Sequence, residues 1–171
     1  MAESTWPACL HESAHVVAAR ELLHAINIRA FVVGPSSGIT CYRRPAHVDV
    51  FAAAVATAAG HAAERLADVH EPPAITRAPT PPAAAVALLQ RPVDVGSADI
   101  DSCDSITILR WCEAAPSDCW EGRWRLLHAT ADEFVTEHSV EILEHAGTLY
   151  REGAVALDDA EADGGIEYVD K

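Results

Sequence analysis

The chain has 171 residues, half of them hydrophobic, and a formal net charge of -14 at pH 7. This length suits one compact domain with a real core and is short for two ordinary domains. Binding to a phosphate backbone depends on clustered Lys and Arg, so the negative charge excludes nucleic acid as an expected partner.

The first half of the chain reads as two helices that flank a small sheet. Residues 5–25 have apolar side chains at helical spacing, which predicts an amphipathic helix. Residues 26–33 and 39–42 are β-branched or alternating and flank a glycine turn, which predicts a short antiparallel pair. Residues 48–69 are rich in alanine, with one Gly and no Pro, which is typical of a buried helix.

The second half begins with a loop and returns to helix. Five prolines between residues 70 and 82 exclude a helix there and predict a long loop. We expect a short helix over residues 83–90 and another through residues 97–113. Residues 124–151 carry one long amphipathic pattern, which predicts a helix that closes the bundle.

These elements predict a mainly α fold of the α+β class, in which a small antiparallel β-sheet lies near the first helix. The many alanines and few aromatic residues favour closely packed helices over a large sheet. Residues 1–157 are expected to form the domain. Residues 158–171 are acidic and contain glycine, so we expect a flexible tail.

Two histidines lie four residues apart in the first predicted helix, His11 and His15, and Glu12 lies between them. On a helix this spacing puts both imidazoles on one face, within reach of one ion. Bound Zn²⁺ would lower the pKa of a coordinated water towards about 7, and Glu12 would take its proton and pass it to a leaving amine. The motif predicts peptide hydrolysis, and a chance motif in a metal-free helical protein is the plain alternative.

The motif and three later segments resemble the peptidase domain of FtsH-type proteases, the membrane-anchored AAA zinc proteases. His-Glu-Ser-Ala-His at residues 11–15 resembles the His-Glu-Ala-Gly-His of that family, with Ala14 in place of Gly. Residues 32–40 resemble its strand, turn and strand, and residues 59–64 its Gly-Arg-Ala-Ala-Glu helix. Residues 96–100 resemble the segment whose Asp binds zinc. The resemblance implies a zincin-like domain with zinc metalloendopeptidase activity.

A catalytic zinc usually has three protein ligands, so one more is needed besides the two histidines. The resemblance assigns this place to Asp99, while Asp101 and Asp104 on the same predicted helix are rivals. Glu64 is either the third ligand or, as we favour, a carboxylate that accepts a hydrogen bond from a ligand imidazole. His61 is the one further histidine singled out for testing.

A substrate peptide is expected to add as a strand beside the sheet edge at Gly38, Ile39 and Thr40, by analogy with zincins and with peptide recognition in general. The Gly-x-x-x-x-Gly-Lys-Ser/Thr sequence of an ATPase is absent. We therefore expect an ATP-independent metalloprotease that acts on peptides or unfolded protein. The alternative is a catalytically weak or inactive metallopeptidase-like module that binds or regulates a protein.

The remaining sequence features concern location and assembly. Neither a signal peptide nor a run of about 18 apolar residues is present, which predicts a cytoplasmic protein without membrane insertion. Five cysteines without a Cys-x-x-Cys pair predict reduced thiols, mostly in the core. We expect a monomer or a small homo-oligomer.

Overall fold

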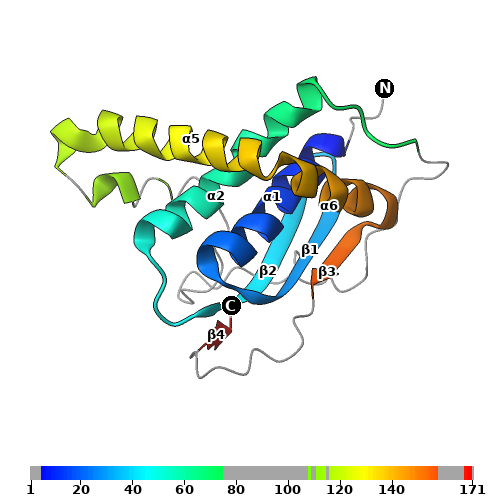
Figure 1. The fold of residues 1–171 in the computed structure, drawn as a ribbon, viewed down its shortest axis with the longest axis horizontal. Coiled ribbons are helices and arrows are strands. Elements are labelled where there is room, and N and C mark those ends of the chain that lie inside the picture. Colours follow the sequence, from blue (N-terminus) through cyan, green and yellow to red (C-terminus); the bar gives the residue numbers. More distant parts are fainter. Residues whose placement is uncertain (1–4, 75–107, 109–110, 115, 158–167, 171) are drawn as a thin grey trace.

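The computed structural model of the chain describes residues 5–74, 108, 111–114, 116–157 and 168–170, drawn in Figure 1. The elements in chain order are α1 (Trp6–Leu23), β1 (Ile26–Gly34), β2 (Ser37–Pro45), α2 (Val50–Glu64), the 3-10 turn η1 (Arg65–Asp68), the 3-10 turn η2 (Ser117–Cys119), α5 (Trp120–Glu137), α6 (Ser139–Glu152), β3 (Ala154–Leu157) and β4 (Tyr168–Asp170). Residues 108 and 111–113 are also helical. The predicted mainly helical α+β class is confirmed.

The sheet has the strand order β3-β1-β2-β4, with antiparallel pairing throughout. The β1–β2 hairpin places Ala30 opposite Thr40, and on its other side Ala30 lies opposite Val155 of β3. β4 pairs with the last residues of β2, where Val169 lies opposite Arg44. The two central strands therefore belong to one hairpin, which directly follows α1 in the chain.

Helix α1 lies across the two central strands and contacts α2 and α6 as well (Figure 1). Because it has neighbours on most sides, its buried residues surround the helix axis instead of forming one stripe. Leu10, Val16 and Val17 are fully buried. The helix ends at His24, which adopts a left-handed conformation, and the Ala25 N–H donates to the carbonyl oxygen of residue 19 at 2.9 Å. The motif helix is thus the central element of the core.

Helix α2 begins at a side-chain cap and packs closely on α1. The Asp49 carboxylate accepts a hydrogen bond from the Ala52 N–H at 2.8 Å, which satisfies one of the unpaired donors of the first turn. The buried residues of this helix are small, among them Ala59, Gly60 and Ala63. Small side chains let the two helix backbones approach, so polar groups on the two helices meet directly.

The structure differs from the prediction in the last third of the domain. The long helix expected over residues 124–151 is two helices, because the chain turns at His138. α5 packs against α2 and buries Leu127 and Phe134, whereas α6 packs against α1 and buries Ile142. The break at His138 therefore separates the part of the chain that packs on α2 from the part that packs on α1.

Two further strands, β3 and β4, were missed, and β4 lies within residues 158–171, where a flexible tail was expected. β3 follows Gly153, which ends α6 in a left-handed conformation at φ 78° and reverses the chain onto β1. Its four residues are too few for a periodic pattern to be recognised. The helix predicted over residues 83–90 and most of the one through residues 97–113 lie outside the described residues. In the part of the chain that is described, no helix has both the length and the apolar character needed to cross a bilayer.

Candidate metal centre

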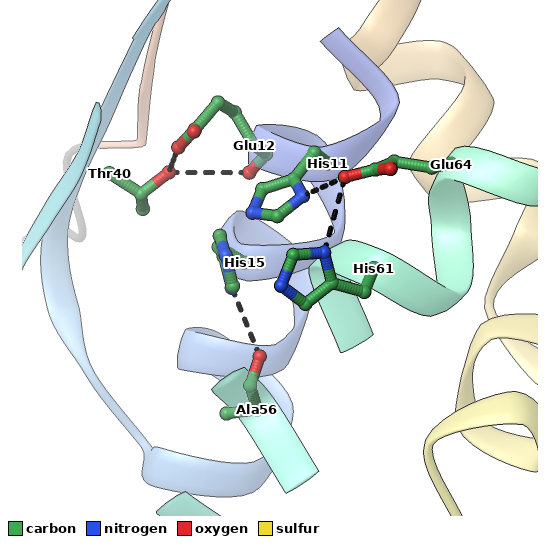
Figure 2. Close-up of polar contacts among 7 residues, drawn as sticks. All are labelled: His11, Glu12, His15, Thr40, Ala56, His61 and Glu64. Atoms are coloured by element: carbon green, nitrogen blue, oxygen red, sulfur yellow. Dashed lines mark hydrogen bonds and ion pairs between the residues drawn. The ribbon is translucent and has the colours of Figure 1, made fainter. Parts of the chain in front are cut away.

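The motif residues of α1 face helix α2 and the hairpin strand β2 (Figure 2). His11 and His15 lie one helical turn apart, and their ring centroids are 4.7 Å from each other. The i,i+4 spacing therefore brings the two imidazoles together, as expected for a metal clamp.

Each of the two histidines is held through its Nδ1 atom. His11 Nδ1 is 2.6 Å from Oε1 of Glu64, and His15 Nδ1 is 3.0 Å from the carbonyl oxygen of Ala56. A backbone carbonyl or an ionised carboxylate can only accept, so both Nδ1 atoms are the donors. In a neutral imidazole this places the ring lone pair on Nε2. Contacts of this kind behind metal-binding histidines fix the tautomer and the ring orientation.

The two Nε2 atoms both pack against the backbone of α2 at Gly60. A Cβ atom added at Gly60 would lie 2.7 Å from Nε2 of His11 and 2.7 Å from Nε2 of His15. No methyl group can occupy that position unless both rings shift, so a glycine is required here. Two Nε2 lone pairs held near one another against the Gly60 backbone form a donor pair that a zinc ion can bind.

Glu12 points away from these rings, towards β2. Its side chain is buried, with 6 % of the residue exposed. The hydroxyl Oγ1 of Thr40 donates to Glu12 Oε2 at 2.6 Å. A Cβ added at Gly38 would lie 2.5 Å from Oε1 and 2.6 Å from Cδ of Glu12, so only glycine leaves room for the carboxylate at this point of the strand. Strand β2 thus determines where the Glu12 carboxylate lies.

Glu64 serves two histidines at once. Its Oε1 contacts His11 Nδ1 and also lies 3.4 Å from Nδ1 of His61, one turn earlier on α2. The 2.6 Å separation from His11 Nδ1 is a hydrogen bond, because two ligands of one tetrahedral zinc are about 3.4 Å apart at normal bond lengths. The contact is the one expected of a carboxylate that orients a metal-binding imidazole.

The predicted third ligand cannot be placed among these groups. Its aspartate candidates, Asp99, Asp101 and Asp104, lie outside the described residues. The site as described therefore consists of two imidazoles, the carboxylates of Glu12 and Glu64, and the glycine against which both Nε2 atoms pack.

The predicted substrate edge lies next to Glu12. Gly38 leaves room for the Glu12 carboxylate, Thr40 donates a hydrogen bond to it, and Ile39 pairs with Phe31 in the hairpin. Strand β4 pairs with β2 only over residues 43–45, so this pairing leaves residues 38–40 uncovered. The predicted edge segment, residues 38–40, is therefore in direct contact with the Glu12 carboxylate.

Some residues of this site escaped the sequence analysis. Gly60 was treated only as part of a resemblance, although a single glycine inside an alanine-rich helix is itself a signal of close packing. Thr40 was assigned to the substrate edge and not to Glu12, because nothing in the sequence connects residues 28 positions apart. The carbonyl of Ala56 carries no sequence signal at all.

Cys9 lies two residues before His11 in α1, and its chemistry is determined by its burial. The pKa of the Cys9 thiol is raised to about 12. Desolvation by burial is the largest cause, a hydrogen bond with Thr5 acts in the opposite direction, and the nearby charge of Glu12 adds to the rise. At neutral pH the thiol therefore stays protonated, and it supplies neither a nucleophile nor a thiolate ligand.

No protein-family model, curated protein or solved structure matches the chain.

Proposed function

We propose that the protein is an ATP-independent zinc metallopeptidase, with His11 and His15 as metal ligands and Glu12 as the general base. The observation that carries the proposal is that the two Nε2 atoms lie close together at Gly60, while both Nδ1 atoms are held by acceptors. The resemblance of residues 11–15 to the FtsH-type motif supports the same assignment.

Zinc at this place would supply a Lewis acid and lower the pKa of a bound water towards about 7. Glu12 follows His11 directly in α1, and its carboxylate is turned towards β2. Thr40 holds Oε2, and Oε1 is the oxygen that would take a proton and return it to the leaving amine.

The rest of the assignment comes from the resemblance and from the strand geometry. Asp99 is proposed as the third ligand, with Asp101 and Asp104 as the alternatives. The substrate is a peptide or an unfolded protein segment that adds beside β2, where Gly38 and Thr40 contact Glu12. We propose a cytoplasmic location and a monomer or small homo-oligomer.

The decisive experiment compares casein cleavage by the wild type and by Glu12→Gln, with the zinc content of both measured by elemental mass spectrometry. Loss of cleavage with zinc retained is the expected result. The matched control is Glu21→Gln, an exposed glutamate of the same helix that lies outside the site. An equal loss in the control, or cleavage that survives in Glu12→Gln, would remove Glu12 from the mechanism.

A second candidate is a metallopeptidase-like module that binds a protein without cleaving it. The burial of Glu12 and its short hydrogen bond to Thr40 favour this candidate, because a purely structural carboxylate is held in the same way. A zinc-loaded wild type that cleaves neither casein nor a library of peptides would support it.

A further inference from the structure

We infer that His61, Glu64 and the Nδ1 side of His11 form a second, weaker site for a divalent transition-metal ion. The three residues each offer a ligand atom, and these atoms all lie within 4.8 Å of one another. They come from two helices, since His61 and Glu64 belong to α2 and His11 to α1. The inference goes beyond the proposed peptidase centre, because that centre uses the other nitrogen of His11, Nε2.

An ion can reach this cluster from solution. The side chain of His61 is 47 % exposed and that of Glu64 is 43 % exposed, whereas that of His11 is 15 % exposed. Figure 2 shows His11 and His61 each turning a ring nitrogen towards the same carboxylate. The adjacent Arg65 pairs with Asp132 of α5, so its guanidinium is engaged away from Glu64.

The donor set decides the class of ion. Two imidazole nitrogens and one carboxylate oxygen suit zinc, copper or nickel, whereas calcium and magnesium prefer oxygen ligands alone. His61 and Glu64 are three residues apart on α2, so they lie on one face and bind as a pair with little rearrangement. Ligand exposure makes this site weaker than a buried one.

The second site competes with the proposed zinc centre for His11. An ion on Nδ1 replaces the proton that lies between His11 and Glu64 Oε1, and these two atoms must then separate from 2.6 Å to the wider spacing of two ligands. An imidazole that binds one ion on each nitrogen must also lose both ring protons, which is costly near neutral pH. Each ion therefore lowers the affinity for the other, by the same factor in both directions.

The test is equilibrium dialysis of the full chain against increasing Zn²⁺, with bound zinc measured by elemental mass spectrometry. The wild type should show a tight class and a weaker class of bound zinc. His61→Ala and His61→Asn should lose the weaker class and keep the tight one. His47→Ala removes an exposed histidine outside the site and should keep both. The exposed thiol of Cys119 contributes the same background to every variant.

Two results would overturn the inference: a wild type without the weaker class, or a weaker class that persists in both His61 variants. Failure of the proposed zinc centre looks different, because the tight class would then be missing from all four proteins while the weaker class still depends on His61. Binding is measured directly, so the test does not require peptidase activity.

Discussion

Glu64 at the end of α2 holds His11 in α1, with Oε1 2.6 Å from Nδ1. The two residues are 53 positions apart in the chain, and small residues on α2 let the helices approach closely enough for this contact. The same carboxylate faces His61. The orientation of the first motif histidine therefore depends on a second helix.

Removal of the Glu64 carboxylate should weaken zinc binding without abolishing it. Glu64→Ala leaves His11 Nδ1 without this acceptor, and loss of such a partner typically lowers metal affinity by about 10–100-fold. Competition against a chromophoric chelator measures the affinity. Glu133→Ala, an exposed glutamate on α5, is the control and should bind zinc as the wild type does. Unchanged affinity in Glu64→Ala would show that Glu64 does not orient His11.

Replacement of Gly60 by alanine should abolish zinc binding at the His11–His15 pair while the fold survives. The added Cβ would lie 2.7 Å from Nε2 of both His11 and His15, so both rings must move away from residue 60. Gly to Ala within a helix otherwise gains roughly 1 kcal/mol. Gly122→Ala on α5, whose Cβ would meet nothing within 4 Å, should gain stability and leave zinc binding unchanged.

Thermal unfolding of the metal-free proteins measures the effect of the Gly60 substitution on stability. The zinc content measures its effect on metal binding. A Gly60→Ala protein that binds one zinc per chain with wild-type affinity would show that zinc binding does not depend on the ring positions that Gly60 allows.

The spacing of His11 and His15 was enough to predict one shared face, because a helix repeats every 3.6 residues. The contact between Thr40 and Glu12 was not predictable, since it depends on how the hairpin register turns Thr40 towards α1. The turn at His138 depends on which helices α5 and α6 contact. Local patterns therefore predicted most of the described elements and the proximity of His11 to His15, and tertiary packing determined what supports them.

Loss of the Thr40 hydroxyl should slow hydrolysis and destabilise the protein. Thr40→Val keeps the shape but removes the hydroxyl that donates to the buried Glu12 carboxylate, and an unsatisfied buried group typically costs about 1–3 kcal/mol. Thr40→Ser keeps the hydroxyl and should retain most of the activity. Chemical denaturation and kcat with zinc-loaded protein are the measurements. Equal defects in the Val and Ser variants would show that a retained hydroxyl does not preserve function, so the hydrogen bond to Glu12 would not explain the effect.

Cys9 should resist alkylation in the folded protein. This residue is 1 % exposed, and burial raises the pKa of its thiol to about 12, so the reactive thiolate forms only well above neutral pH. Cys119 is exposed and should react first. Iodoacetamide labelling at pH 7 followed by peptide mass mapping distinguishes them. Rapid labelling of Cys9 in the native state would show that α1 opens and that its core position is not maintained.

Asp99 should be required for full zinc occupancy if the resemblance to FtsH-type peptidases assigns the third ligand correctly. Asp99→Ala removes one of three protein ligands, so we expect the zinc content of the purified protein to fall well below that of the wild type. Asp101→Ala and Asp104→Ala are the matched controls, because both rivals follow Asp99 closely in the chain and carry the same charge. If one control loses zinc and Asp99→Ala does not, that control marks the ligand. If all three retain zinc while His15→Ala loses it, the third ligand is not an aspartate of this segment, and His61 becomes the next residue to substitute.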